Sequence, residues 1–364
     1  MKQEISLRIF TLLFFLLPIA ADSQNSLIEL LTKFNSADKT DLIKENHTTQ
    51  NFIRLFDDEE EKADSTIEIN GVQTKFKRIS IQRTTWDGKL MTINSYSDGS
   101  SAPTSTEIIE FDINNNIVSK VTEFTDENMS FMNEKMTYDY DNKNRLTNIH
   151  LSKNDVPANT QILKIDYENN NNLPISAEMD LIMEMNLHRE PIDKGYRYHF
   201  DIKIPDDLIQ MVKSELGDKA TDEEIKKALG PFGKVQKKYS DIVFLEDGNL
   251  KEEVFEENKE IEGQLDLISK VIFDKNFNIL SKKDFVDGQV SSTVIYEYND
   301  HQKVKSVQFD ENPKMENEYD SQGNMIKENN QFGYFFMHYK DGKLSQKLEY
   351  DSAGDIIIME IYTY

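Results

Sequence analysis

Histidines are the first side chains to consider for chemistry, and in this chain their spacing forms no recognised motif. Only His188 and His199 are expected to share a face, because both lie on the polar side of one predicted hairpin. Two imidazoles at such a position would suit a transition metal. Two exposed strand residues explain the same spacing, so no metal site is predicted. The six histidines are His47, His150, His188, His199, His301 and His338.

Carboxylates are abundant, with 66 Asp and Glu residues in 364. Asp112, Asn114, Asn116 and Glu123 have the spacing of a calcium loop at positions 1, 3, 5 and 12, but Ile117 stands where that loop needs glycine. Asp274, Asn276 and Asn278 repeat the spacing without the final acid. The preference of Asp and Asn for β-turns explains both segments without a bound ion. No pair of carboxylates stands out for hydrolysis, so a hydrolase with a dispersed acidic site is only a third hypothesis.

The common catalytic signatures are absent from the sequence. There is no G-x-S-x-G, H-E-x-x-H, Walker loop or G-x-G-x-x-G pattern. The chain contains no cysteine, which excludes thiol catalysis, thiolate metal sites, disulfides and a lipidated cysteine anchor. The sequence therefore predicts no catalytic residue, no cofactor and no metal, and an enzyme is not favoured.

The first residues are typical of a secretory signal peptide. Lys2 and Arg8 flank the apolar run 9–19, and small residues follow it. We expect a signal peptide over 1–23 with cleavage before Gln24; a retained N-terminal anchor is the alternative. The chain is expected to be exported to the periplasm, the outer surface or the medium. No second apolar run predicts a transmembrane segment, and the net charge of −24 argues against nucleic acid as a partner.

The positions of apolar residues divide the mature chain into four parts. A helical N-terminal segment is expected over 24–62, since Leu27, Leu30, Leu31 and Phe34 fall on one helix face. Alternation with a period of two predicts an antiparallel β region over 63–204. Asp206 as a cap, and a capping box at Thr221 and Glu224, predict a two-helix insertion over 205–233. A β-hairpin repeat region follows over 234–364.

Residues 175–204 give the clearest single hairpin. Apolar residues occupy the odd positions from Ile175 to Leu187, and Tyr196 to Ile204 alternate in the same way. Pro191 and Gly195 mark the expected loop. The apolar face includes Met179, Met183 and Met185, and methionine adapts to irregular ligands. A carrier of a hydrophobic ligand in a β-sheet cavity lined by these residues is therefore the alternative hypothesis to ordinary core packing.

A seven-residue cassette recurs along the chain: an aromatic residue, then usually Asp, then Gly or Asn at the fifth place, then an aliphatic residue. The acid can accept backbone N–H groups of a turn, and the fifth place is expected to be left-handed. The aromatic and aliphatic residues should then pack across a hairpin. Eight aromatic residues are predicted to form this structural framework: Phe111, Tyr140, Tyr167, Phe244, Phe273, Tyr298, Tyr319 and Tyr350.

The cassette resembles the YD-repeat (RHS) family, most closely over 138–146 and 318–325. The resemblance covers roughly 106–175 and 240–364. It implies stacked β-hairpins and an extracytoplasmic location. Large members of that family are cell-surface or secreted β-shells that enclose toxins or bind partners. This chain is far too short for such a shell and lacks the D-P-x-G self-cleavage motif, so the resemblance implies no toxin activity here.

Fold class is therefore predicted as mainly β, an antiparallel meander of stacked hairpins with an N-terminal helical segment and a two-helix insertion. The leading function hypothesis is a secreted or periplasmic, non-enzymatic β-repeat protein that binds a protein or glycan at the cell envelope. Its framework tyrosines recur where cross-strand packing needs them, so a local binding site is expected where the repeat pattern breaks, between Ile175 and Gly233.

Overall fold

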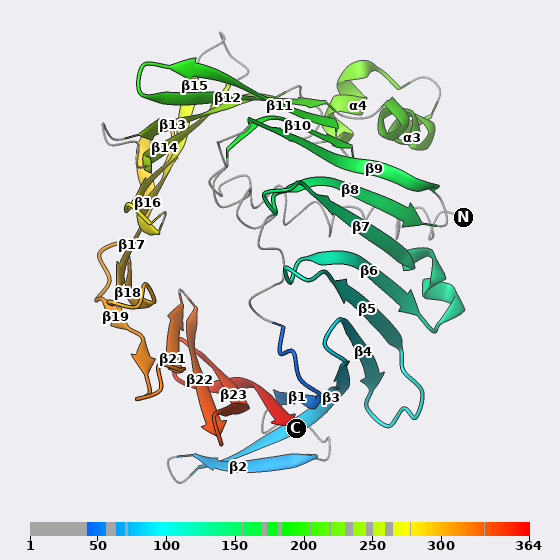
Figure 1. Cartoon of the computed structure of the whole chain (residues 1–364), viewed down its shortest axis with the longest axis vertical. Coiled ribbons are helices and arrows are strands. Elements are labelled where there is room, and N and C mark those ends of the chain that lie inside the picture. Colours follow the sequence, from blue (N-terminus) through cyan, green and yellow to red (C-terminus); the bar gives the residue numbers. More distant parts are fainter. Residues whose placement is uncertain are drawn as a thin grey trace. The chain divides into compact units, whose positions relative to one another are not determined.

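The computed structural model is mainly antiparallel β structure with few helices, which confirms the predicted fold class (Figure 1). It describes residues 42–55, 63–69, 72–153, 156–168, 173–180, 184–203, 206–217, 220–229, 236–244, 250–258, 265–276, 278–330 and 332–364. The predicted signal peptide and the first helical stretch after it lie outside these residues and stay predictions.

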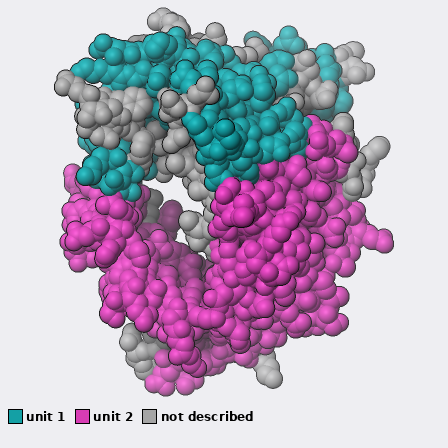
Figure 2. All heavy atoms as spheres, viewed as in Figure 1, with its two compact units in different colours: residues 1–37, 139–150, 161–294 teal, residues 38–138, 151–160, 295–364 magenta. Residues whose placement is uncertain are grey.

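The chain folds into two compact units, which are coloured separately in Figure 2. The described residues of unit 1 lie within 139–150 and 161–294, and those of unit 2 within 38–138, 151–160 and 295–364. The two units are therefore interleaved along the sequence. The predicted parts 63–204 and 234–364 each contribute strands to both units, because hairpins that follow one another in the chain do not all join the same unit.

Unit 1 is a meander in which each strand pairs antiparallel with the next. Alternate positions give each strand one buried face, and Tyr198, Ile242 and Val271 are 0–1 % exposed. The strands are β9 (Val156–Tyr167), β10 (Pro174–Asp180), β11 (Glu184–Ile192), β12 (Gly195–Lys203), β13 (Gln236–Phe244), β14 (Leu250–Asn258), β15 (Leu265–Phe273) and β16 (Ile279–Val286).

The predicted long strand from Ile175 to Leu187 is wrong in one respect, because it is two strands, β10 and β11, that pair with each other. Met179 lies opposite Met185 and Ala177 lies opposite Leu187. Odd residues pair with odd residues, so the alternation continues through the reversal unchanged. No Gly, Pro, Asn or Asp stands at 181–183 to mark the reversal. The predicted loop is also shorter than expected, since Pro191 lies within β11 opposite Tyr196.

The two-helix insertion is present as α3 (Asp206–Leu216) and α4 (Asp222–Leu229), which pack side by side in unit 1 (Figure 1). Gly217, with φ of +97°, ends α3. Thr221 and Glu224 form the capping box: the Thr221 backbone N–H donates to Glu224 at 2.8 Å, and Glu224 N–H donates to the Thr221 hydroxyl at 3.3 Å. Among the described residues, no helix is long and apolar enough to cross a bilayer.

Unit 2 contains a strand where the sequence predicted helix. β1 (His47–Arg54) lies within the expected helical segment 24–62, and the described residues before it, 42–46, are irregular. β-Branched Thr48, Thr49 and Ile53 favour a strand. β1 pairs with β3 (Val72–Trp86) on one side and with the C-terminal β24 (Ile356–Thr363) on the other. The backbone of β1 is thus saturated by strands far away in the sequence.

The other elements of unit 2 follow the predicted alternation and turns. They are β2 (Ser65–Ile69), β4 (Leu90–Ser97), β5 (Ser105–Phe111), β6 (Ile117–Phe124), the 3-10 helix η2 (Glu127–Met132), β18 (Val304–Phe309), β19 (Met315–Glu316), β20 (Glu318–Tyr319), β21 (Met325–Asn330), β22 (Gly333–Lys340) and β23 (Lys343–Asp351). Three further strands, β7 (Glu134–Tyr140), β8 (Leu146–Lys153) and β17 (Gln289–Tyr298), and also β9, contain residues of both units.

Two apolar clusters stabilise unit 2. Phe52, Phe76 and Met359, all at most 4 % exposed, form one cluster with Leu348 and Ile356. The second cluster joins β4, β5 and β6 through buried side chains and is covered by Leu42 and Trp86. Its buried members are Met91, Ile109, Phe111 and Ile117. The first cluster joins the N-terminal and C-terminal strands of the unit, so β1 is part of its core.

Candidate functional site

A cavity of about 210 Å³ lies on one face of four adjacent strands of unit 2, β24, β1, β3 and β4. Seven of its lining residues are polar and four are apolar. The lining residues are Leu42, Ile43, His47, Thr49, Asn51, Gln82, Thr84, Met91, Ile93, Glu360 and Tyr362. The cavity lies outside 175–233, where a binding site was expected.

The register of these strands explains why residues so distant in sequence line one cavity. Cross-strand partners in an antiparallel sheet lie on the same face. Three rows of partners therefore face the cavity side: Tyr362–Thr49–Gln82, Glu360–Asn51–Ser80 and His47–Thr84–Ile93. On β4 the residues that line the cavity are apolar, namely Ile93 and Met91. A ligand on this face would meet hydrogen-bonding groups at β24 and β1 and an apolar wall at β4.

Several polar groups of the cavity have unused hydrogen-bonding capacity. The Asn51 amide donates to the Ser80 hydroxyl at 2.9 Å. Thr49 and Thr84 are 7 % and 6 % exposed. Within the described part of the chain, their hydroxyls and the Gln82 amide make no side-chain hydrogen bond to protein. These groups line the cavity, where water or a ligand can bond to them.

Glu360 and Tyr362 form a coupled pair at the β24 edge of the cavity. They are two residues apart on one strand, so both side chains lie on the same face, and the Tyr362 hydroxyl donates a hydrogen bond to Glu360 Oε2. Burial raises the pKa of Tyr362, and the hydrogen bond to the Glu360 carboxylate raises that pKa further. Tyr362 thus stays a neutral donor to Glu360 at ordinary pH.

The segment 42–46 holds one wall of the cavity in place. The Lys44 ammonium lies 4.1 Å from the Phe111 ring centroid and donates to the Asn115 side chain. The Asn46 side chain accepts from the Trp86 backbone N–H at 2.6 Å. The His47 ring contacts the Glu45 carbonyl through Nδ1 at 2.8 Å, and its centroid lies 6.2 Å from that of Tyr362. This segment thereby brings Leu42 and Ile43 to the cavity.

The groups that line this cavity can recognise a polar ligand. Amide, hydroxyl, imidazole and carboxylate groups can donate to and accept from a hydroxyl-rich molecule, and Tyr362 and His47 offer ring faces. Glu360 is the only carboxylate in the lining. Paired carboxylates, which glycoside hydrolysis requires, are therefore not present in this lining.

The eight predicted framework aromatics each lie at the last or next-to-last residue of a strand: Phe111 (β5), Tyr140 (β7), Tyr167 (β9), Phe244 (β13), Phe273 (β15), Tyr298 (β17), Tyr319 (β20) and Tyr350 (β23). Five of them lie opposite the cassette's aliphatic residue: Phe111–Ile117, Phe244–Leu250, Phe273–Ile279, Tyr319–Met325 and Tyr350–Ile356. Tyr167 differs, because its partner is Pro174 rather than Leu173. The side chain of Phe244 lies outside the described part.

The turns of the cassette share one hydrogen-bonding pattern. In the turn after Tyr319, Asp320 Oδ1 accepts from the N–H groups of Gln322 and Asn324 at 2.9 and 2.8 Å, and the Asp320 N–H donates to the Asn324 carbonyl at 2.9 Å. The turns that begin at Asp141, Asp274, Asn299 and Asp351 repeat these contacts. Asn299 shows that an amide oxygen serves as well as a carboxylate.

The fifth place of the cassette is left-handed. Asn115, Asn144, Gly323 and Gly354 have φ between +66° and +86°. Gln302, which departs from the Gly or Asn pattern, adopts φ of +60° at the same place. Left-handed backbone costs an ordinary residue about 1–2 kcal/mol, so the hydrogen bonds of that turn hold Gln302 in a strained conformation. The shorter Asp-Gly turns, at 287–288 and 341–342, also have positive φ at both residues.

The sixth place of the cassette, which the sequence analysis overlooked, locks the turn. Asn116, Asn278 and Asn324 each donate a side-chain N–H to the turn's own Asp at 2.9–3.0 Å. The signal available in the sequence was the recurrence of Asn directly before the aliphatic residue that ends the cassette. Arg145 and Lys303 occupy the same place in their turns.

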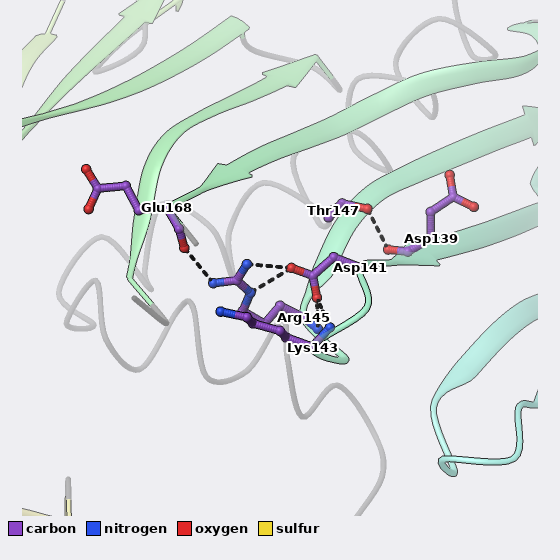
Figure 3. Close-up of polar contacts among 6 residues, drawn as sticks. All are labelled: Asp139, Asp141, Lys143, Arg145, Thr147 and Glu168. Atoms are coloured by element: carbon purple, nitrogen blue, oxygen red, sulfur yellow. Dashed lines mark hydrogen bonds and ion pairs between the residues drawn. The ribbon is translucent and has the colours of Figure 1, made fainter. Parts of the chain in front are cut away.

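Arg145 joins its own turn to Glu168, which follows β9 in unit 1, as Figure 3 shows. Its guanidinium contacts Asp141 Oδ2 at 2.6 and 2.7 Å and donates to the Glu168 carbonyl at 3.1 Å. It also lies 4.4 Å from the Tyr167 ring centroid. Burial acts to raise the pKa of Asp141, but hydrogen bonds from Arg145 and two backbone N–H groups outweigh it and hold that pKa below its usual range.

The predicted methionine face does not line the cavity. Met179 and Met185 are half-buried and lie opposite each other in unit 1, whereas Met183 lies outside the described residues. His188 and His199 do face each other, with stacked rings 4.8 Å apart, and His199 Nε2 lies 3.0 Å from Glu190. No group of three or more His, Cys, Asp or Glu in the described ranges is arranged to hold a metal ion.

Comparisons with known proteins give limited information. No family model matches the chain, and a search of curated proteins finds no match. Similar solved structures include TcdB2-TccC3, a YD-repeat toxin complex, at 8 % identity over 78 % of this chain and 22 % of that one, with a TM-score of 0.22. The same complex without its hypervariable C-terminal region is 10 % identical over 84 % of this chain and 19 % of that one, with a TM-score of 0.23.

A porin-like protein from Bacteroides uniformis is 9 % identical over 86 % of this chain and 96 % of that chain, with a TM-score of 0.22. This chain spans about a fifth of the length of the two TcdB2-TccC3 chains. At these TM-scores the likenesses carry no argument about function. The resemblance to YD-repeat proteins is therefore weak beyond the turns described above.

Proposed function

We propose that this chain is an exported, non-enzymatic β-repeat protein that binds a glycan at the cell envelope through the cavity of unit 2. The observation that carries the proposal is the row arrangement of Thr49, Gln82 and Thr84, whose polar groups are held on paired strands without side-chain partners. Sugars present closely spaced hydroxyls that both donate and accept, which suits amides and hydroxyls fixed in this way.

A glycan fits this cavity better than the hydrophobic ligand of the alternative hypothesis. The cavity wall is mostly polar, and an apolar ligand would leave the Gln82 amide and the Thr49 and Thr84 hydroxyls without hydrogen bonds, at a cost of about 1–3 kcal/mol per group. A protein partner is the other possibility. The cavity holds about 210 Å³, which suits one end of a chain of sugars, whereas a stable protein interface buries roughly 1,600 Å².

Export and envelope location are part of the same proposal. They rest on the basic start, the apolar run 9–19 and the small residues after it. Sequencing the N-terminus of protein recovered from a bacterial periplasm or medium tests them directly. A mature protein beginning at or near Gln24 supports export, and a chain that keeps residues 1–23 in the cytoplasm contradicts it.

The binding test is a glycan array followed by titration of the best glycan. Gln82→Leu keeps the size of the side chain and removes its amide, so we expect a loss of affinity of about tenfold, corresponding to one or two hydrogen bonds. Gln50→Leu is the matched control, because Gln50 lies on β1 with its side chain on the other face of the same strands. Equal affinities of the Gln82→Leu and wild-type proteins would contradict the proposed site.

A further inference from the structure

Glu360 carries information about the ligand that the proposed function alone does not contain. We infer that the carboxylate of Glu360 recognises an ammonium group, so that the glycan taken by this cavity ends in an amino sugar with a free amine. The inference rests on the proposed function, since it names the ligand class of the same cavity.

The first observation is that Glu360 is a negative charge without a positive partner. Its Oε2 accepts from the Tyr362 hydroxyl, and among the described residues no Lys or Arg forms an ion pair with it. Lys347 is the nearest cation by register, directly opposite Glu360 on β23. However, the Lys347 ammonium lies over the Phe335 ring, 4.5 Å from its centroid. A half-buried carboxylate is stabilised by a charged donor more than by a neutral one.

The second observation is that an aromatic ring lies beside this carboxylate and that further rings follow it along the strands. Tyr362 bonds to Glu360 on the same strand face, and the centroid of the His47 ring lies 6.2 Å from that of Tyr362 and 5.7 Å from that of Tyr364. A carboxylate next to ring faces is the combination that proteins use to hold ammonium groups. A neutral hydroxyl would gain the hydrogen bond from such a site but not the attraction of the rings for a cation.

The third observation is that the protein itself fills an equivalent arrangement next to the cavity. The Lys343 ammonium is paired with the Glu45 carboxylate and lies 4.7 Å from the Tyr364 ring centroid. Glu45 gives Lys343 an ion pair and Tyr364 gives it a cation–ring contact. Glu360 and Tyr362 could give the same two interactions to a ligand. The difference is that the second pair faces the cavity and receives no side-chain cation from the described chain.

The ligand must also satisfy the groups around Glu360. Asn51 lies opposite Glu360 in register and Gln82 lies one row away. Both can bond to ring hydroxyls next to an amine-bearing carbon. The apolar wall of Met91 and Ile93 is then available to the C–H face of the sugar ring. An amino sugar can therefore contact the carboxylate with its rings, the amides of Asn51 and Gln82, and the apolar residues of β4. A simple alkylamine would contact only the carboxylate and the rings.

The test compares three monosaccharides and one amino-acid derivative by ligand-observed NMR titration of the full mature chain at pH 6, where aliphatic amines are protonated. The probes are glucosamine, N-acetylglucosamine, glucose and Nα-acetyl-lysine amide. We expect glucosamine to bind about tenfold more tightly than the other two sugars, as a charge-assisted hydrogen bond would give. Glu360→Gln, which keeps the shape of the side chain, should abolish that preference and leave the affinity for glucose within about twofold.

A control variant separates the local effect from the effect of net charge. Glu318→Gln removes one negative charge from β20, away from the cavity lining, and should leave the preference for glucosamine unchanged. If it weakens glucosamine as much as Glu360→Gln does, the preference is a general charge effect and the inference is wrong.

The remaining outcomes are distinguishable. Equal binding of glucosamine and glucose, unaffected by Glu360→Gln, overturns the inference and leaves the proposed glycan binding standing. Binding of the lysine derivative without glucosamine overturns the amino-sugar assignment in favour of a peptide amine. Failure of every sugar to bind, with the fold shown intact by its amide spectrum, overturns the proposed function itself.

Discussion

The contact between Arg145 and Asp141 gives the sharpest stability prediction, because it closes one cassette turn while Arg145 also donates to the Glu168 carbonyl directly after β9. Asp141→Ala removes an acceptor for two backbone N–H groups, at about 1 kcal/mol each. It also leaves the Arg145 side chain, only 11 % exposed, without its carboxylate, which costs roughly 1–3 kcal/mol more. We therefore expect the free energy of unfolding to fall by about 3–5 kcal/mol, the sum of these contributions.

A double-mutant cycle isolates the interaction of the two side chains. Asp141→Ala, Arg145→Ala and the double variant are compared by urea unfolding, following the transition of unit 1. The expected coupling energy is about 1.5–3 kcal/mol, the range for hydrogen bonds to charged groups. The same cycle on Asp274 and Asn278, whose turn has a neutral donor at 3.0 Å, should give a smaller value. A coupling at Arg145 below about 0.5 kcal/mol, the usual error of additivity, would refute the reasoning.

The same carboxylate predicts a pH dependence with a defined sign. The pKa of Asp141 is lowered in the folded chain, so the native state binds fewer protons than the unfolded state at acid pH. Its contribution to stability is present above the unfolded pKa of about 3.9 and is lost as pH falls through the lower folded value. Urea midpoints measured from pH 7 to pH 2 should fall more steeply for the wild type than for Asp141→Asn. Parallel curves would contradict this assignment.

Three further predictions concern single positions. Gly354→Ala should destabilise unit 2 by about 1 kcal/mol, because φ at this position is +86°. Gln302→Gly should raise stability by up to about 1 kcal/mol, because glycine adopts φ of +60° without strain. Urea unfolding measures both changes, and changes of the same sign would be inconsistent with left-handed turns. Thr221→Ala should lower the stability of α4 by about 1 kcal/mol, because it removes the N-cap of that helix. Amide hydrogen exchange in α4 measures this loss, and unchanged protection of its amides would argue against the capping box. The pKa of Tyr362 is raised by burial and by Glu360, so Tyr362 should stay protonated in the folded chain above the usual pKa of about 10, and stability should fall as pH rises past that value. In a pH titration followed by absorbance at 295 nm, which detects tyrosinate, the Tyr362→Phe protein should show one tyrosine fewer among those that ionise at the highest pH. Identical titration curves for the two proteins would contradict this prediction.

The local turn chemistry was predictable from sequence, because it depends on residues within seven places of one another. Asp320 and Gly323 mark a turn whose hydrogen bonds join residues 320–324 to one another. The two helices were predictable for the same reason, since Thr221 and Glu224 cap α4 locally. Where hydrogen bonds close within a few residues, pattern and structure agree.

The cavity could not be predicted in this way, because its rows join strands from the two ends of the chain. Thr49 lies next to Tyr362 only because β1 pairs with β24. Nothing in the local sequence of β1 specifies that partner, and its short apolar pattern is compatible with either helix or strand. The reversal between Met179 and Met185 escaped notice for a related reason, since no Gly, Pro, Asn or Asp stands at 181–183 and the alternation is preserved.

Methionine methyl groups offer the most direct test of the central claim, that the cavity of unit 2 is the binding site. Met91 lines that cavity, while Met179 and Met185 lie on the alternative face in unit 1. The chain is labelled with ¹³C at methionine methyl groups and titrated with the glycan that binds best. A saturable shift of the Met91 signal, with those of Met179 and Met185 unchanged, is the result predicted here. A shift of Met179 and Met185 with Met91 unchanged would contradict it.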